Sequence, residues 1–187
     1  QAFDDFCLGD TGAMFGHSPP PIAEAIAHQA SRGLTAMLPG EDSVVVGDAL
    51  ASAFGLPWWQ VTSSASEANR AVIRWCRGIT GRDKILVFNG CYHGAVDDVF
   101  VDLRDGVPEL RRSLVGQVYD VRDHTRVIEF NDRDALAAAL APGDVAAVLT
   151  EPALTNVGMV LPEAGYLDAM RDLTRRFGTL LVFDETH

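Results

Sequence analysis

The first half of the chain carries apolar residues at helical spacing, interrupted by glycine and proline. Proline suits the first turn of a helix and glycine the residue that follows its end. The pattern predicts helices that begin at Pro21 and end near Gly33, that cover residues 43–54, and that cover residues 68–77. The last has an apolar face through Val72, Trp75 and Cys76 and is closed by Gly78. The apolar residues 58–62 form a strand-like piece between the second and third helices.

From residue 84 onward, short apolar runs alternate with helical patterns. Runs that are apolar on both faces, separated by helices, are typical of a parallel sheet covered by helices on both sides. The strands are predicted at 85–88, 99–103, 126–130, 146–150 and 179–183, and the helices at 132–140 and 164–177. We therefore predict an α/β fold. The chain stops at His187, directly after a buried strand, so we expect it to be a fragment.

Composition narrows the possible functions. The 187 residues are 48% hydrophobic and carry a formal net charge of −11 with no basic run, which argues against nucleic-acid binding and against anionic membrane surfaces. No apolar stretch approaches the roughly 20 residues of a membrane-spanning helix. The three cysteines, Cys7, Cys76 and Cys91, are too scattered for a disulfide framework or a zinc site. With no secretory signal visible, we expect a cytoplasmic protein.

Two segments in the middle of the chain carry candidate chemistry. Residues 63–67 open the third predicted helix with small hydroxyl residues, and the backbone N–H groups of such a helix start suit a phosphate. Ser64 and Glu67 also have the spacing of a capping box, which is the structural alternative. In the turn 89–94, Tyr92 and His93 suit stacking on a flat ring or acid–base work. The alternative there is a rim tyrosine beside an idle histidine.

Two further segments follow predicted strands. Glu151 comes directly after the strand 146–150, and Asn156 carries an amide that can donate to a ligand oxygen or simply serve a turn. Asp184 comes after the strand 179–183, where a carboxylate needs a partner. A protonated ring nitrogen would be such a partner, although Asp184 also suits the N-cap of a following helix.

Together these segments resemble the class III, fold type I, pyridoxal-phosphate-dependent aminotransferases, and most the branch that contains glutamate-1-semialdehyde 2,1-aminomutase. The similarity keeps motif order and spacing over essentially the whole chain. The matching stretches are GHSPPPIAEAI at 16–26, SSASEANRAVIRWCRGITGRDKI at 63–85, FNGCYHG at 88–94, EPALTNVGMVLP at 151–162 and LLVFDE at 180–185.

The resemblance implies a fold and a division of the chain. The fold is the large domain of fold type I, a mostly parallel sheet between helices, incomplete in this chain. Residues 1–40 would be the end of an N-terminal segment and residues 41–187 the first part of the cofactor-binding large domain. The rest of that domain and a small C-terminal domain would be missing.

The resemblance also implies how pyridoxal 5'-phosphate is held. The backbone and hydroxyl groups of the Ser64–Ser66 loop would grip the phosphate, with Ala65 standing where the family has glycine. Tyr92 would stack on the pyridine ring with His93 beside it. The remaining implied contacts come from the ends of strands: Asn156 to the phenolic oxygen, Glu151 as a support of that neighbourhood, Asp184 to the ring nitrogen, and Thr186 at a position where the family often has a valine against the ring.

The family's chemistry requires a lysine that forms a Schiff base with the cofactor. Lys84 is the only lysine of this chain and matches a non-catalytic position of the family. The Schiff-base lysine would lie beyond Asp184, in sequence that this chain does not include. Among the predicted contacts, Asp184 is therefore the catalytic residue that the chain itself supplies.

The implied activity is transfer of an amino group between an amino acid or amine and a keto acid or aldehyde. The implied partners are a small-molecule amino donor, a keto-acid acceptor and a second copy of the chain, since residues 37–42 resemble a loop that reaches the partner's site in a homodimer. Alternatives on the same scaffold are an aminomutase, a racemase and a decarboxylase. A catalytically inactive partner protein that keeps the cofactor fold is the alternative outside enzymes.

Overall fold

The computed structural model describes residues 2–10, 12–35 and 37–187. The chain divides after Val61 into two compact units, which we call the amino-terminal unit and the sheet unit. The predicted functional division at residues 40 and 41 concerns the whole protein and stays a prediction.

The amino-terminal unit contains two of the predicted helices. The helix α1 spans Pro20–Arg32 and the helix α2 spans Glu41–Phe54, and Gly33 and Gly55 follow their last turns as expected. Within the described residues, neither helix holds a buried side chain. The predicted strand at 58–62 is wrong: the backbone there is irregular, and Trp58 is 89% exposed. A short apolar run becomes a strand only where a neighbouring strand pairs with it.

The sheet unit is built on a parallel sheet whose strand order, within the described residues, is β4-β1-β5-β6. Every neighbouring pair in this sheet is parallel. The strands confirm the predicted runs with small shifts at their ends: β1 Lys84–Phe88, β4 Thr125–Ile128, β5 Val145–Thr150 and β6 Leu180–Phe183. Buried residues along both faces of β1 and β5 are the reason why these segments read as continuous apolar runs.

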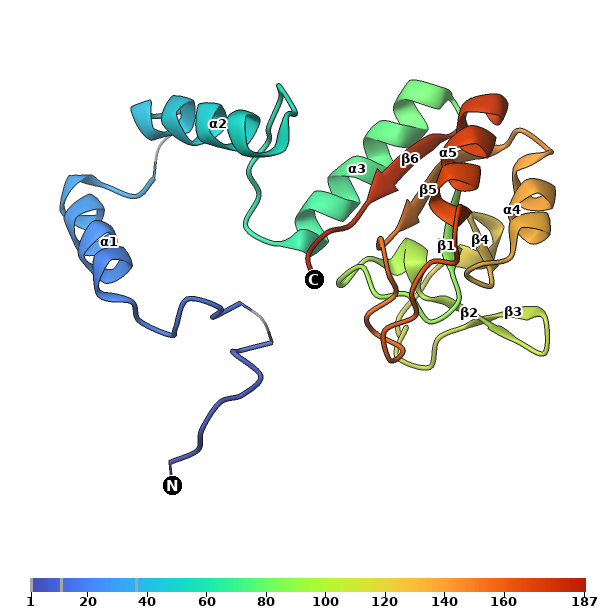
Figure 1. Ribbon diagram of the computed structural model, residues 1–187, viewed down its shortest axis with the longest axis horizontal. Helices are drawn as coiled ribbons and strands as arrows, with labels where there is room; N and C mark the ends of the chain where they lie inside the picture. Colours follow the sequence, from blue (N-terminus) through green and yellow to red (C-terminus); the bar gives the residue numbers. More distant parts are fainter. Residues whose placement is uncertain (1, 11, 36) are drawn as a thin grey trace. The chain divides into compact units, whose positions relative to one another are not determined.

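Helices cover the two faces of this sheet, so the unit has three layers (Figure 1). The helix α3, Ala65–Thr80, packs on one face, while α4, Arg133–Leu140, and α5, Tyr166–Phe177, pack together on the other. Alternate residues of β1 enter the two cores: Ile85 and Val87 join the α3 side, and Leu86 and Phe88 join the side of α4 and α5. The predicted α/β fold with helices on both faces is confirmed.

The helix α3 differs from its prediction in length and in its buried face. It continues through Gly78 and ends at Thr80, followed by Gly81 in a left-handed conformation with φ of 66°. Its buried residues are Asn69, Ile73 and Cys76, whereas Trp75, predicted on the apolar face, is 55% exposed. The tertiary packing of the helix outweighs the modest intrinsic cost of an interior glycine.

The predicted strand 99–103 is only partly correct. Asp97–Val99 is a 3₁₀ turn, η1, and the strand β2 covers Val101–Arg104. It pairs antiparallel with β3, Val107–Leu110, in a hairpin apart from the parallel sheet, and the sequence pattern did not predict β3. A second 3₁₀ turn, η2, lies at Val121–Asp123 before β4. Among the helices in the described ranges, none has the length and apolarity that crossing a bilayer requires.

Candidate functional site

The site lies at the carboxyl edge of the parallel sheet. From β1 the chain moves outward to β4, and from β5 it moves the other way to β6, so the loops after β1 and β5 diverge. In open α/β sheets, ligands bind at such a switch point. Three of the four predicted segments follow β1, β5 and β6 at this edge. The fourth is the start of α3, which runs antiparallel to β1 and so begins there (Figure 1).

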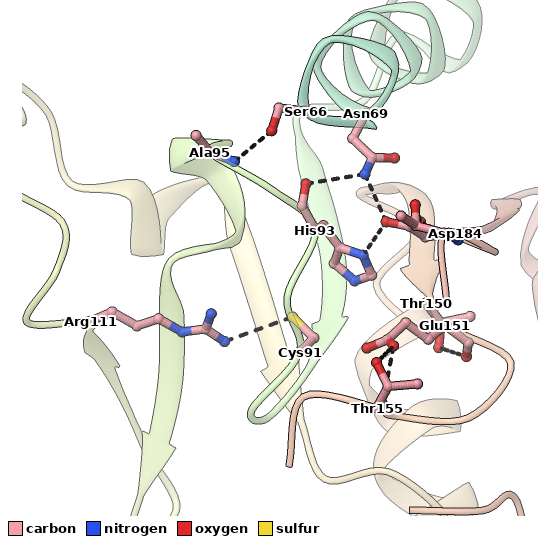
Figure 2. A network of polar contacts seen from close by, with 11 residues as sticks. Ser66, Asn69, Cys91, His93, Ala95, Arg111, Thr150, Glu151, Thr155 and Asp184 are labelled. Atoms are coloured by element: carbon pink, nitrogen blue, oxygen red, sulfur yellow. Dashed lines mark hydrogen bonds and ion pairs between the residues drawn. The ribbon is translucent and has the colours of Figure 1, made fainter. Parts of the chain in front are cut away.

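Asp184 is the centre of a polar network at the end of β6 (Figure 2). Its backbone N–H donates to the carbonyl of Thr150 at 2.8 Å, which continues the pairing of β6 with β5. Its Oδ2 accepts a hydrogen bond from Asn69 Nδ2 at 2.8 Å and lies 2.9 Å from His93 Nδ1. Its Oδ1 accepts from the Thr186 hydroxyl at 2.6 Å and from the Thr186 N–H at 3.2 Å. The carboxylate is thus buried, held on both oxygens and fixed in direction.

This network keeps both Asp184 and His93 charged. Burial works to raise the pKa of Asp184, but hydrogen bonds from His93, Thr186 and Asn69 outweigh it and hold that pKa well below its ordinary value. Burial works to lower the pKa of His93, but its hydrogen bond with Asp184 outweighs burial and raises the pKa to about 9. A buried charge is stable only when it is paired, and here each group supplies the other's partner.

His93 has one nitrogen left over. Its ring is almost fully buried, and among the described residues its Nε2 has no hydrogen-bond partner. The same is true of one oxygen, Oε1, of the buried Glu151. The other oxygen of Glu151 accepts from the N–H of Thr155 at 3.0 Å and from its hydroxyl at 2.5 Å (Figure 2). Buried polar atoms are nearly always paired, so both atoms indicate a missing partner.

The start of α3 combines a helix cap with free backbone donors. Ser64 Oγ accepts from the Glu67 N–H at 3.2 Å, so the capping interpretation of this pair is confirmed. Glu67 reaches back to the N–H and hydroxyl of Ser63. The N–H groups of Ala65 and Ser66 have no hydrogen-bond acceptor among the described residues. These two donors, at the positive end of the helix dipole, form a simple anion site.

The loop after β1 packs tightly against the start of α3. The Ser66 hydroxyl accepts from the Ala95 N–H at 2.9 Å, which leaves its own proton free (Figure 2). A side chain at Gly94 would place its Cβ 2.2 Å from Ser66 Oγ and 3.0 Å from Ser66 Cα. Gly94 also has φ of +82°, which other residues rarely adopt. A glycine is therefore required where this loop meets the helix.

Tyr92 and Asn156 lie on the rim of the site. Tyr92 is 49% exposed. The Asn156 amide donates to the Gly90 carbonyl at 3.1 Å and so bridges the loops after β5 and β1. Its predicted donation to a ligand oxygen stays a prediction.

Among the predicted residues, the structure brings Asp184, His93 and Thr186 into direct contact. It places the Ser64–Ser66 loop beside them, joined to the loop of His93 through Ala95. The sequence reasoning missed Asn69. Its position gave a signal, because Asn69 stands four residues before Ile73 and seven before Cys76, on the stripe that the helix buries. A polar residue on such a stripe has a buried partner.

A family model described as aminotransferase class-III matches residues 3–187. The chain belongs to this family. Among curated proteins, the glutamate-1-semialdehyde 2,1-aminomutase of Methanothermobacter thermautotrophicus is 36% identical over 190 residues, which cover 99% of this chain and 44% of that protein. The predicted family and branch resemblance are thereby confirmed.

Solved structures agree. A glutamate-1-semialdehyde-aminomutase from Pseudomonas aeruginosa PAO1 matches with a TM-score of 0.95 and 56% identity, over 99% of this chain and 41% of that one. A second structure of that aminomutase is a complex with PMP, the amine form of pyridoxal phosphate. An omega-transaminase from Sphaerobacter thermophilus matches with a TM-score of 0.84 and 31% identity, over 96% of this chain and 43% of that one.

The class III chain therefore spans less than half the length of the relatives it matches. The predicted cofactor is confirmed at the level of the family, through the PMP complex of the Pseudomonas aeruginosa aminomutase.

Proposed function

We propose that the whole protein containing this chain is a pyridoxal-phosphate-dependent aminotransferase. It would move an amino group between an amino acid or amine and a keto acid or aldehyde. The observation that carries the proposal is the buried, ionised Asp184 at the switch point of the sheet, held by His93, Asn69 and Thr186. A carboxylate fixed in this way is suited to keep a proton on a basic ring nitrogen.

The residues of the site fit pyridoxal phosphate. The unpaired N–H groups of Ala65 and Ser66, with the Ser66 hydroxyl, suit its phosphate. Asp184 suits its ring nitrogen, and the half-exposed Tyr92 is available to stack on its ring. The unpaired Nε2 of His93 and Oε1 of Glu151, each without a partner in the described part of the chain, mark polar positions that such a site would complete.

When bound, the cofactor supplies an electron-accepting ring that stabilises the charge left when a proton leaves the substrate's α-carbon. Asp184 contributes by holding the ring nitrogen protonated, and His93 contributes by keeping the Asp184 carboxylate charged and oriented. The backbone donors at the start of α3 hold the phosphate in place. Thr186 restricts the carboxylate from its other side.

The lysine that this chemistry needs comes from elsewhere than Lys84. The Lys84 ammonium pairs with Asp144 at 3.1 Å, at the amino-terminal end of β1. That end is about 13 Å from the carboxyl end of the strand, at 3.3 Å per residue. Lys84 therefore serves the opposite edge of the sheet, and the proposal assigns the cofactor lysine to the remainder of the whole protein.

An internal amino shift, as in an aminomutase, is the second candidate. The 56% identity with the Pseudomonas aeruginosa aminomutase favours it, while the omega-transaminase match favours transfer between two substrates. Racemase and decarboxylase chemistry would need the same Asp184. Racemisation would remove the same α-proton and return one to the opposite face of that carbon, whereas decarboxylation would break the bond to the carboxyl carbon instead. We further propose a homodimer with shared active sites, residues 37–42 reaching the partner, in the cytoplasm.

The test is to follow the absorbance of the cofactor bound to the whole protein while amino donors are added. The proposal predicts conversion from the lysine-bound form to the amine form, and its reversal by a keto acid. An aminomutase would consume its own substrate without a separate acceptor. Absence of any shift with every donor would contradict the transaminase proposal.

A matched pair of variants assigns the chemistry to Asp184. Asp184→Ala should lower turnover by on the order of 100-fold, the scale for loss of one well-placed electrostatic group. The fold should persist, because His93 can give up its proton once its partner is gone. Glu185→Ala, at the exposed neighbouring position, should leave turnover near normal. Equal turnover of the two variants would contradict the role of Asp184.

A further inference from the structure

We infer that Asn69 is a positioning residue that fixes the direction of the Asp184 carboxylate from the first turns of α3; this inference rests on the proposed function. The stretch 63–85 that resembles the family contains Asn69, but the resemblance assigned it no role, and the phosphate interpretation uses only the first residues of α3. Asn69 acts through Asp184 rather than on the cofactor itself.

The geometry of the Asn69 amide carries the inference. The side chain is buried, with 6% of its surface exposed. Its nitrogen donates to the Asp184 Oδ2 at 2.8 Å and to the His93 carbonyl at 3.1 Å (Figure 2). Both hydrogens of the amide therefore have acceptors. Because both neighbours are oxygen acceptors, the NH₂ group must face them, and the reversed amide would set oxygen against oxygen.

These two bonds join three elements at one atom. Asn69 belongs to α3, His93 to the loop after β1, and Asp184 to the end of β6. The imidazole of His93 approaches the same Oδ2 through Nδ1, so its main chain and its ring are both tied to the Asn69–Asp184 pair. Loss of the amide would free the loop and the carboxylate together.

Packing alone does not require an amide at this position. The side chains of the other buried members of the same helix stripe, Ile73 and Cys76, belong to the apolar core. An apolar side chain at position 69 would avoid the cost of burying an amide, so the two acceptors are the physical reason for asparagine.

The test compares three variants of the whole protein. Asn69→Leu keeps the approximate shape and removes both bonds. Asn69→Asp keeps the shape and sets a second carboxyl group against Asp184, with His93 the titratable group that faces both. Ile73→Ala, one turn further along the same buried stripe, is the control for loss of packing. The measurements are the dissociation constant of pyridoxal phosphate, by absorbance titration of the cofactor-free protein at pH 6 to 8.5, and the melting temperature without cofactor.

Asn69→Leu should weaken cofactor binding about tenfold or more at every pH, the scale of one hydrogen bond to a charged group. Asn69→Asp should show a deficit that grows with pH, because two facing carboxylates repel once both are ionised. Ile73→Ala should lower the melting temperature yet bind the cofactor within about twofold of the unaltered protein, since it touches none of these bonds.

Two results would overturn the inference while leaving the proposed function intact. One is cofactor affinity in Asn69→Leu equal to that of Ile73→Ala, and the other is a deficit in Asn69→Asp that does not change with pH. Should Asn69→Leu fail to fold, the pH series of Asn69→Asp decides alone. Failure of the unaltered protein to bind the cofactor would overturn the proposed function and this inference with it.

Discussion

The two units of the chain differ in how many apolar side chains they bury. The sheet unit contains two apolar cores, one on each face of its parallel sheet, and its strands β1 and β5 are buried along nearly their whole length. The amino-terminal unit has two well-formed helices, but in the described residues neither buries a side chain, and α2 exposes Val44, Val45 and Val46. Its helices could be predicted from local sequence, whereas the sheet depends on contacts between distant segments.

This difference explains why the site is found in the sheet unit. Catalytic groups must be held in a fixed direction, and a buried sheet edge with helices on both sides provides that rigidity. The amino-terminal unit instead exposes apolar side chains along α2, and exposed apolar patches are typical of interaction surfaces. This exposure agrees with the proposed homodimer, in which the unit would bury these side chains against a second copy.

The largest expected effect is a loss of stability when a core residue of the sheet unit is truncated, compared with an exposed residue of the amino-terminal unit. Leu86→Ala, at a fully buried position of β1, should lower the free energy of unfolding of the sheet unit by about 2–5 kcal/mol. Val45→Ala, at a 67% exposed position of α2, should change it by less than about 0.5 kcal/mol. Hydrogen exchange at the amides of β5 measures both. Equal losses of protection would show that the two units share one core.

The charged pair of the site should make the stability of the sheet unit depend on pH. The pKa of His93 is raised to about 9, above its ordinary value of 6.5, so the folded state binds its proton more tightly than the unfolded chain does. The contribution is complete below pH 6.5 and is lost as the pH rises through 9. We expect a decline on the order of 1–3 kcal/mol over that range.

The variant His93→Asn isolates this decline. It keeps a donor near the position of Nδ1 but does not titrate, so subtraction of its pH curve removes contributions that do not come from His93. Urea unfolding at pH 6, 7.5 and 9.5 is the measurement. Parallel curves for the variant and the unaltered protein would show that the pair contributes nothing to this dependence.

The smallest effect sharpens the comparison within the sheet unit. Gly94→Ala and Gly106→Ala both place a side chain at positive φ, +82° and +77°, which costs about 1 kcal/mol each. Only Gly94 also has a close neighbour, Ser66, while nothing lies within 4 Å of the Cβ position at Gly106. Gly94→Ala should therefore cost about 1 kcal/mol more than Gly106→Ala and should also weaken phosphate binding. Thermal melts with and without inorganic phosphate measure both effects. Equal stability and equal phosphate binding of the two variants would mean that Ser66 moves away from the added side chain at no cost.

Patterns along the chain were sufficient to predict an element where that element depends on its own residues or is buried on both faces. The glycines after α1 and α2, and the runs of β1 and β5, are of this kind. The run at 58–62 looked like a strand because it is apolar, yet a strand needs a partner, and none pairs with it in the described residues. The hairpin of β2 and β3 was hidden for the opposite reason, because β3 is exposed along its length and carries no burial pattern.

The site was predicted in its parts rather than in its connections. Each strand-end residue could be found from its position, and the resemblance to the family supplied the roles. The bonds between them join residues up to 115 positions apart, so no local pattern contains them. Asn69 shows the limit, since its partner is visible only when α3 and the end of β6 are placed side by side.

The central claim is that Asp184 keeps the ring nitrogen of the cofactor protonated. The most direct measurement is the ¹⁵N chemical shift of that nitrogen, in the whole protein loaded with labelled pyridoxal phosphate, from pH 6 to 8.5. The account predicts a protonated nitrogen throughout this range, and loss of that proton in Asp184→Ala but not in Glu185→Ala. An unprotonated nitrogen in the unaltered protein, or a shift that Asp184→Ala leaves unchanged, would contradict it.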